Sequence, residues 1–397
     1  MEKIKICNLT KIFSPHPQRA LALLDQGLSK EDIFNQTGQA VGLSGVSFDV
    51  DEGEIVVVMG LSGSGKSTLI RCINRLIDPS RGQVFIDGVD ITTLDHQELL
   101  TLRRQKFGMV FQHFALFPHR SIICNVEYGL EIQGVEKEKR HGKALEALKL
   151  VGLEGWEEAF PKQLSGGMQQ RVGLARALAV EPDVLLMDEA FSALDPLIRG
   201  DMQNELVLLQ DRVRKTILFI THDLDEALKI GNRVVLMKDG KVVQIGTPEE
   251  IITTPSNDYV KRFVENVDHS KVLTAQAVLI KPRAVAYPDS PPQVLFDKMK
   301  EQDISCIVAI NHDETLEGVI HIDALRQATE RGDKTVKELI VREISGVPLK
   351  TPVSRLISIL ANWHSMPLPV IDHQRKLQGI VVKSAVFSVL SKQRGNQ

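Results

Sequence analysis

The sequence predicts an α/β domain built on a buried parallel sheet, followed by a smaller α+β domain. Three observations lead to this fold class. Short apolar runs at 55–59, 184–187 and 216–220 each end at polar residues, as buried parallel strands do. A glycine-rich turn leads from the first run into a helix. Near residues 265–280 the pattern changes, and a chain of 397 residues is long enough for two or three domains.

The composition is that of a soluble globular protein, with 43% hydrophobic and 25% charged residues. No apolar run is long enough to form a membrane-spanning helix, so the chain is not expected to cross a bilayer by itself. The net charge is −3 and no long basic block occurs, which argues against nucleic acid as a partner. The cysteines show neither metal nor redox spacing; they are Cys7, Cys72, Cys124 and Cys306.

The N-terminal part combines strand and helix patterns. Residues 5–10 predict a strand, and 14–42 predict a helical insertion inside a β-rich edge. Within the insertion, 18–27 carries an apolar stripe, and Ser29 precedes Asp32 by three positions, a helix-start signal of the capping-box kind. The pattern does not reveal what the insertion is for. Near the end of the α/β region, the Asp-Gly pair at 239–240 predicts a hairpin.

A weak internal repeat marks the second domain. Five residues recur at an offset of 61 positions: Pro291, Leu295, Leu316, Gly318 and Ala324 return as Pro352, Leu356, Leu377, Gly379 and Ala385. Both copies predict helix, strand, turn and strand in this order, which favours duplication over chance and suggests two halves about a pseudo-twofold axis. We therefore expect a first domain at 1–265, a linker at 266–280 and repeats at 281–335 and 336–397.

A phosphate-binding loop is predicted between the first apolar strand and the helix after it, which should run from about Lys66 to Leu76. The run Gly60-Leu61-Ser62-Gly63-Ser64-Gly65-Lys66-Ser67, followed by Thr68, has the form Gly-x-x-x-x-Gly-Lys-Ser. Its glycines let backbone N–H groups approach phosphates at a helix N-terminus. Lys66 is expected to reach the β- and γ-phosphates of ATP, and the Ser67 hydroxyl to bind Mg²⁺. The alternative, a glycine-rich turn without a ligand, is disfavoured because strand and helix flank the run as the motif requires.

Chemically active side chains follow further strands. Asp188 closes one strand, where a carboxylate can hold Mg²⁺, usually through water, and Glu189 can orient and deprotonate the attacking water. His222 follows another strand, where a neutral imidazole can contact the γ-phosphate and hold Glu189 in place. Gln112 offers an amide oxygen to Mg²⁺ or water. Glu189, His222 and Lys66 are thus the predicted catalytic residues, and Ser67, Gln112 and Asp188 the predicted magnesium ligands. The alternatives are that the two acids are merely solvated, that the histidine is structural, and that the glutamine only marks a strand end.

A second anion site is predicted at Ser165-Gly166-Gly167, which opens a helix expected to end near Val180. Its hydroxyl and backbone N–H groups can bind an anion. Because Lys66 is already expected to bind one nucleotide, the anion site at this second helix start would have to bind a second nucleotide. The economical arrangement is two chains head to tail, with Ser165 of each closing over the ATP that Lys66 of the other holds. A helix cap beside a glycine turn is the alternative.

Together these runs resemble the ATP-binding subunits of ABC transporters, over about residues 1–250. The residues that carry the resemblance are Gly60–Ser67, Gln112, Leu164–Gln169, Val184–Glu189, Ser192–Asp195 and His222. The resemblance implies a P-loop NTPase domain with an antiparallel β subdomain and a helical subdomain, which hydrolyses ATP with Mg²⁺ as a homodimer. It also implies that 192–195 couples the two composite sites. The residues it assigns to the partner's ATP are Ser165, Gly166, Gly167 and Gln169. Phe13 falls where the family stacks an aromatic ring on adenine; an ordinary core Phe is the alternative.

More narrowly, the chain resembles the ATPase subunit of quaternary-amine (glycine betaine/proline betaine) importers. This rests on the insertion 19–41 and on the stretches 114–120 and 187–199. The resemblance implies a peripheral subunit on the cytoplasmic face of the membrane, with a membrane permease and an extracytoplasmic substrate-binding protein as partners. The permease should dock on Phe114–His119, which we name the docking segment; an ordinary surface loop is the alternative.

Subunits of that group also carry a C-terminal pair of CBS motifs, which fits the repeat. The resemblance implies an adenine or cyclic nucleotide as a ligand of the pair, or a sensor of ionic strength, with a dimerising or structural role as the alternative. The usual ribose-binding acid is displaced in the first repeat, where Asp323 comes one position early, and is lacking in the second, 379–385.

Other functions compatible with the sequence differ in solute or in class. Importers of choline, carnitine or proline are not separated from betaine importers by these residues. A non-transport ABC ATPase acting on DNA or ribosomes would usually carry a coiled-coil insertion or two cassettes. A nucleotide-gated scaffold would not need Glu189 and His222, and a small-molecule kinase would not need 164–171.

Overall fold

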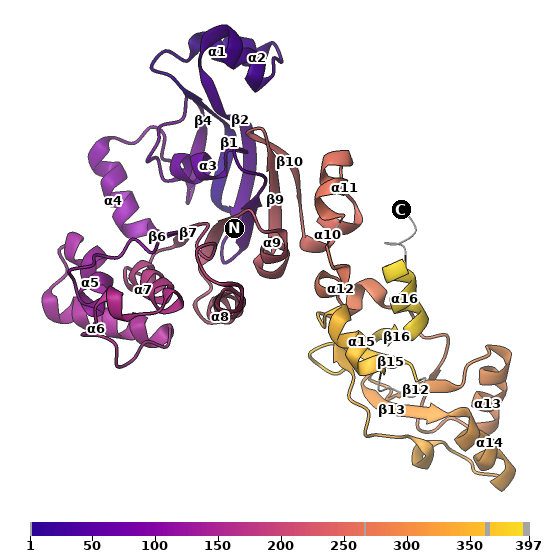
Figure 1. The fold of residues 1–397 in the computed structure, drawn as a ribbon. Coiled ribbons are helices and arrows are strands. Elements are labelled where there is room, and N and C mark those ends of the chain that lie inside the picture. The colour runs from indigo at the N-terminus through magenta and orange to yellow at the C-terminus, as the bar shows by residue number, and fades with distance from the viewer. Residues whose placement is uncertain (1, 266, 362–365, 392–397) are drawn as a thin grey trace. The chain divides into compact units, whose positions relative to one another are not determined.

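The computed structural model describes residues 2–265, 267–361 and 366–391, and it divides into two compact units, Met1–Val267 and Asp268–Gln397 (Figure 1). Among the described residues, none of the helices combines the length and the apolar character needed to span a bilayer. The site residues predicted above all belong to the first unit.

A six-stranded sheet forms the centre of the first unit, in the order β10-β9-β3-β8-β7-β6. All neighbours are parallel except β9 and β10, which form the expected hairpin; Asp239 and Gly240 have φ angles of 49° and 73°, as a type I′ turn requires. Every residue of β3 is buried, which explains its continuously apolar sequence. The strands are β3 (Ile55–Met59), β6 (Phe107–Phe111), β7 (Val184–Asp188), β8 (Thr216–Thr221), β9 (Arg233–Lys238) and β10 (Lys241–Gly246).

A four-stranded antiparallel sheet, in the order β2-β1-β4-β5, is the second layer of this unit. Its strands are β1 (Glu2–Phe13), β2 (Ala40–Asp51), β4 (Arg81–Ile86) and β5 (Val89–Asp90). The first strand is longer than the predicted 5–10 because its pairing with β2 continues as far as Phe13. Apolar residues of β1, β2 and β4 form one core cluster with β3 and the helix α3 (Lys66–Ile73), so the phosphate loop rests on both sheets.

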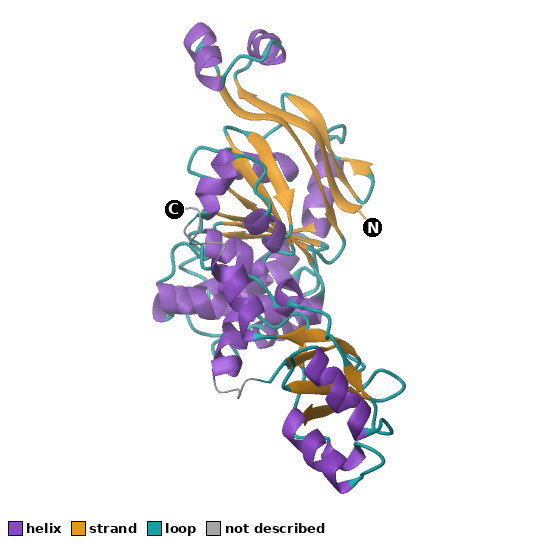
Figure 2. Cartoon of the chain, turned by 90° about the vertical axis from the view of Figure 1, so that its right-hand side faces the viewer, coloured by secondary structure: helices purple, strands orange, loops and turns teal. Residues whose placement is uncertain are grey.

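The insertion between β1 and β2 contains two short helices, α1 (Gln18–Asp25) and α2 (Lys30–Thr37), at one end of the first unit (Figures 1 and 2). Ser29 caps α2, because its Oγ accepts a hydrogen bond of 3.1 Å from the Asp32 N–H. A small apolar cluster of its own, Ile12, Ala20, Ile33 and Val41, attaches these helices to the ends of the two strands.

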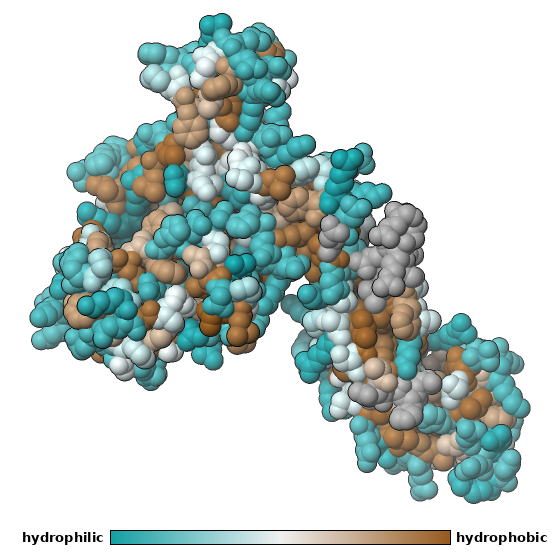
Figure 3. Space-filling view, viewed as in Figure 1, coloured by the Kyte–Doolittle hydropathy of each residue, from teal (hydrophilic) through white to brown (hydrophobic). Residues whose placement is uncertain are grey.

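The remaining helices of the first unit surround the parallel sheet or form a helical group. The surrounding helices are α4 (His96–Lys106), α8 (Pro196–Val213), α9 (Leu224–Ile230), α10 (Pro248–Thr253) and α11 (Asp258–Val264). The helical group comprises α5 (Ile122–Ile132), α6 (Lys137–Leu150) and α7 (Gly166–Ala179), with a 3₁₀ turn at Pro161–Gln163. The helix α3 ends at Ile73, before the predicted Leu76, because Arg75 adopts a φ of 53° and turns the chain. Polar residues cover much of the face of this unit shown in Figure 3.

The second unit contains two three-stranded sheets of the same order, β11-β12-β13 and β14-β15-β16. In each sheet the first pair is parallel and the second antiparallel, as duplication of one unit predicts. The first repeat comprises β11 (Val285–Ala286), α13 (Pro292–Glu301), β12 (Cys306–Ile310), β13 (Leu316–His321) and α14 (Ile322–Arg331). The second comprises β14 (Val347–Pro348), α15 (Val353–Ala361), β15 (Leu368–Ile371), β16 (Leu377–Val381) and α16 (Lys383–Ser391), after a 3₁₀ turn at Lys337–Leu339.

The expected linker at 266–280 differs from the structure. Residues of this interval form α12 (His269–Val272) and a 3₁₀ turn at Ala275–Val278. Leu273 and Val278 are buried in one core cluster with residues of the second repeat, and Ile280 bridges to Ile380. Because these apolar side chains form part of that core, residues 268–280 belong to the second unit, whereas Val267 ends the first.

Candidate active site

The phosphate loop joins β3 to α3 at the carboxyl edge of the parallel sheet. Gly60 and Gly65 both adopt positive φ angles, of 152° and 102°. A Cβ atom at Gly60 would lie 2.2 Å from the Met237 carbonyl oxygen, and one at Gly65 would lie 2.7 Å from the Gly42 carbonyl oxygen. Both positions therefore require glycine, for backbone conformation and for space.

The Lys66 side chain folds back over this loop. Its Nζ donates hydrogen bonds to the carbonyl oxygens of Gly60, at 2.8 Å, and Leu61, at 3.2 Å. Burial lowers the pKa of Lys66, although Glu189 and Asp188 attract its charge and oppose this effect. A buried ammonium held mainly by neutral carbonyls is suited to a phosphate, which would supply a full negative charge.

Ser67 and Asp188 meet where α3 begins and β7 ends. The Ser67 hydroxyl donates to Asp188 Oδ1 at 3.2 Å. Burial raises the pKa of Asp188, so a nearby cation would stabilise its carboxylate form. Across the described ranges, no group of three or more His, Cys, Asp or Glu side chains could hold a metal by itself. The pair instead fits Mg²⁺, which is commonly held by one or two protein oxygens together with water and substrate phosphates.

Glu189 and His222 form a hydrogen-bonded pair, with 3.1 Å between Glu189 Oε2 and His222 Nδ1. Glu189 has a φ of 47°, and its N–H donates to the Ile220 carbonyl at 3.0 Å. Positive φ at a non-glycine residue is sparsely populated and tends to cluster at active sites. The side chains of His222 and Glu189 are 56% and 21% exposed, so the pair can be reached by water.

One cavity of about 670 Å³ brings most of these groups together, although Gly60, Ser64 and Asp188 are not among the residues that line it. Most of the phosphate loop lines it, and so do Thr68, Glu189 and His222. Phe13 lines it as well, and its ring is 48% exposed rather than buried in a core. The cavity thus combines a cationic loop, a carboxylate–imidazole pair and an accessible aromatic ring.

Gly42, which the sequence did not single out, also lines this cavity. A Cβ atom here would lie 2.8 Å from the Phe13 ring and 3.2 Å from Thr68 Cγ2. A glycine within a strand-like sequence does not indicate that it will line a cavity. The contact of Gly42 with Phe13 arises only when β2 pairs with β1.

Gln112 is not among the residues that line the cavity. It follows β6, whereas the phosphate loop follows β3, and β8 and β7 lie between them. Three strand spacings correspond to roughly 14 Å. Its contact with Mg²⁺ or water therefore stays a prediction.

The predicted partner-facing residues also lie away from the cavity of their own chain; they are Ser165, Gly166, Gly167 and Gln169. Ser165 caps α7, and its Oγ accepts a hydrogen bond from the Met168 N–H at 3.4 Å. Ser165 and Gly166 are exposed, so this helix start is accessible to another chain. Gln169 instead bonds within its own loop, to the Leu164 carbonyl at 3.1 Å.

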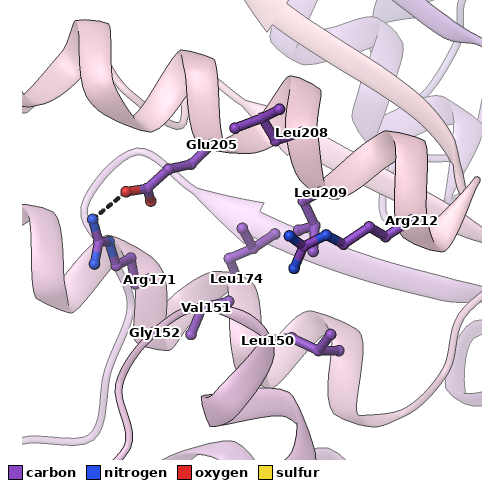
Figure 4. A pocket seen from close by; sticks show the side chains of 9 residues that line it. All are labelled: Leu150, Val151, Gly152, Arg171, Leu174, Glu205, Leu208, Leu209 and Arg212. Carbon is purple, nitrogen blue, oxygen red and sulfur yellow. Dashed lines mark hydrogen bonds and ion pairs between the residues drawn. The ribbon is translucent and has the colours of Figure 1, made fainter.

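A second pocket, of about 220 Å³, lies between α7, α8 and the end of α6 (Figure 4). Arg171 of α7 forms an ion pair with Glu205 of α8 beside it, and apolar side chains such as Leu174 and Leu209 line it. None of the predicted site residues lines this pocket. It marks the contact between the helical group and α8, whose first turn is capped by Asp195.

Comparison with known proteins identifies the family of the chain. A family model described as "ABC transporter" matches residues 43–192, and one described as "CBS domain" matches residues 275–331. The chain is 52% identical over 389 residues to the glycine betaine transport ATP-binding protein OpuAA of Bacillus subtilis (strain 168), covering 98% of this chain and 92% of the relative. The chain belongs to the family of ABC transporter ATP-binding subunits.

Two further comparisons bear on this family membership. The glycine betaine/carnitine transport ATP-binding protein GbuA of Listeria monocytogenes serotype 1/2a (strain 10403S) is 49% identical over 391 residues, covering 98% of each chain. A dimeric, post-hydrolysis structure of the ATP-binding cassette MJ0796 bound to ADP and Pi aligns with a TM-score of 0.52 and 35% identity, over 62% of this chain and 98% of that one. The predicted resemblance to importer ATPases, the ABC ATPase fold and nucleotide binding are thereby confirmed.

Proposed function

We propose that this chain is the ATP-hydrolysing subunit of an importer that takes up a quaternary-amine osmoprotectant such as glycine betaine. It works as a homodimer on the cytoplasmic face of the membrane, where it drives a permease that receives solute from an extracytoplasmic binding protein. The near full-length similarity to OpuAA and GbuA, whose names give glycine betaine as a transported solute, supports this solute class.

The observation that carries the proposal is the division of the site. One cavity holds the phosphate loop, Lys66 and the Glu189–His222 pair, while Ser165 at the start of α7 is exposed elsewhere. A single chain would therefore supply the groups that bind ATP and activate the attacking water, while its own Ser165 is not among the residues that line the cavity. A second chain, placed head to tail, would close it with its own Ser165.

Within this site each residue has a defined task. Lys66 would pair with the β- and γ-phosphates, and Glu189, oriented by His222, would remove a proton from the attacking water. Ser67 and Asp188 would hold Mg²⁺ together with the phosphates, and the ion would supply electrostatic stabilisation of the charge on the phosphoryl group. Burial of Lys66 and Asp188 keeps these electrostatic effects strong.

The first prediction concerns the catalytic carboxylate. Glu189→Gln should lower the rate of ATP hydrolysis by roughly 10²–10⁴-fold because general-base catalysis is lost. ATP affinity should be retained, since the phosphate loop is unchanged. Hydrolysis is measured with the purified full-length chain, and binding with a fluorescent ATP analogue.

Glu181→Gln is the matched control, because Glu181 is an exposed acid that pairs with Lys143 at the opposite end of β7. It should hydrolyse ATP at the rate of the unmodified chain. Equal rates for Glu189→Gln and Glu181→Gln would show that Glu189 is not the base.

The transported solute is tested in the assembled system. With its permease and binding protein in vesicles, the chain should drive accumulation of labelled glycine betaine when ATP is supplied on the cytoplasmic side. Carnitine, choline and proline serve as competitors. A competitor that is accumulated while glycine betaine is not would replace glycine betaine as the assigned solute.

A further inference from the structure

The docking segment begins with an unusual backbone conformation. Phe114 and Ala115, directly after the loop at Gln112, have φ angles of 57° and 50°. Left-handed backbone at a residue with a Cβ atom is sparsely populated, and two such residues in succession persist only where their surroundings hold them. The structure should therefore contain a group that fixes these two residues.

That group is Arg176 of α7. Its Nη1 donates to the Ala115 carbonyl at 2.5 Å, and its Nη2 donates to the Phe114 carbonyl at 3.1 Å. Burial lowers the pKa of Arg176, and among the residues described no carboxylate is recorded as its partner. Two N–H groups of the planar guanidinium thus donate to two consecutive carbonyls. A lysine ammonium cannot reproduce this geometry.

Two further residues on the same face of α7, Gly173 and Gly166, lie close to Phe114 of the docking segment. A Cβ atom at Gly173 would lie 3.6 Å from the Phe114 carbonyl oxygen, and one at Gly166 would lie 3.7 Å from the Phe114 ring. These glycines are seven residues apart, about two helical turns, and so lie on one face of the helix. The contacts run from Gly166, the first residue of α7, to Arg176 near its end.

We propose that Arg176 is a positioning residue that clamps residues 114–115 to α7, so that the permease-docking segment and the partner-facing start of α7 move as one body. The inference rests on the proposed function, because it assigns a mechanical task to two surfaces named there. It adds a specific contact to that function. The Arg176 guanidinium couples residues 114–115, which have a strained backbone, to α7, the helix that would close over the partner's ATP.

Two substitutions at Ala115 separate clamping from general stability. Ala115→Pro excludes positive φ and should break the clamp without touching Arg176. Ala115→Gly adopts positive φ at no steric cost and should leave it intact. Ala115 is exposed, so neither change opens a core. Arg176→Lys keeps the charge but loses the fork.

The first readout is amide hydrogen exchange of residues 112–119 in the full-length chain. We expect Arg176→Lys and Ala115→Pro to speed exchange of this segment roughly tenfold, with unchanged melting temperature, and Ala115→Gly combined with Arg176→Lys to recover part of the protection. If residues 112–119 exchanged in the Arg176→Lys variant at the wild-type rate, the proposal that Arg176 clamps this segment would be overturned. If Arg176→Lys does not fold, Ala115→Pro decides: unchanged exchange would then overturn it.

The second readout is the amount of solute transported per ATP hydrolysed by the complex with its permease in vesicles. Arg176→Lys and Ala115→Pro should lower this ratio roughly fivefold to tenfold, while the KM for ATP stays within about twofold. A parallel loss of hydrolysis and transport, without relief by Ala115→Gly, would show a merely structural role. Absence of ATP-driven uptake by the wild-type complex would count against the proposed function, and hydrogen exchange would still decide the clamp.

Discussion

At the scale of single residues, the site is electrostatically incomplete without a ligand. Lys66 has a pKa lowered by burial, and Asp188 has a pKa raised by burial. Each group would be relieved by a charge of the opposite sign, a phosphate for the ammonium and a divalent cation for the carboxylate. Lys66 lines the cavity and Asp188 contacts Ser67 at its edge, and perturbed groups that lie so close together are typical of active sites.

Glu226 is a buried acid outside the cavity, and it allows a test of this reasoning by pH. Its side chain is 4% exposed, accepts a hydrogen bond of 3.1 Å from Gln203, and has a pKa raised by burial. Because the folded pKa exceeds the unfolded value, the folded chain binds the proton more tightly. The stability that this provides is present below the unfolded pKa and is lost as pH rises through the folded pKa.

Glu226→Gln should therefore raise the melting temperature most at neutral and higher pH, because the amide carries no charge to bury. The gain should be roughly 2–4 °C for each kcal/mol of desolvation removed. Melting curves of both proteins between about pH 5 and pH 8 provide the measurement. A temperature difference that shrinks as pH rises would contradict the assignment of a raised pKa.

At the scale of elements, the strand–loop–helix unit β3–α3 depends on contacts with neighbouring strands. The Gly240 N–H donates to the Ser64 carbonyl at 3.0 Å, so the β9–β10 turn supports the phosphate loop from behind. The Met237 carbonyl leaves no space for a side chain at Gly60. The loop is therefore shaped by the sheet as much as by its own glycines.

A matched pair of glycine substitutions tests this arrangement. Gly60→Ala should weaken ATP binding at least tenfold, since its Cβ would meet a strand carbonyl that cannot move easily. Gly63→Ala should cost only about 1–2 kcal/mol of local strain, because φ is 78° but nothing lies within 4 Å of its Cβ position. Binding of a fluorescent ATP analogue to both variants provides the comparison. Equal affinities would mean that the neighbouring strand does not limit the loop.

At the scale of the whole molecule, the division of the site predicts that catalysis belongs to the dimer. Lys66 lines the cavity, whereas Ser165 is exposed and is not among the lining residues, so we expect a second chain to complete the nucleotide site. The related cassette MJ0796 is a dimer with ADP and Pi. Complementation between two inactive variants is the most direct test of a shared site.

Lys66→Ala and Ser165→Arg should each abolish hydrolysis, and a mixture of the two should regain it. In a mixed dimer one site carries both defects and the other carries none. An equal mixture should therefore reach about a quarter of the wild-type rate if the sites act independently, since about half of the dimers are mixed. Hydrolysis is measured before and after mixing. A mixture no more active than its components would indicate that each chain hydrolyses ATP alone.

Much of the fold could be predicted because its signals are local. The runs 55–59, 184–187 and 217–220 are continuously apolar, and the type I′ turn at Asp239–Gly240 follows from its two residues. The interval 266–280 was expected to be a linker, but its residues 268–280 pack as part of the second unit. The apolar residues of this segment become buried only through contact with the second repeat, which lies much later in the sequence.

The sequence by itself determined which residues could be proposed for the site, because a glycine-rich phosphate loop and polar residues directly after apolar strands are local signals. Only the tertiary structure decided which of these groups share a cavity, that Gly42 stands against Phe13, and that Arg176 holds Phe114 and Ala115. The physical reason is that contacts between distant segments depend on the order and packing of strands and helices, and this information is not contained in any local pattern of residues.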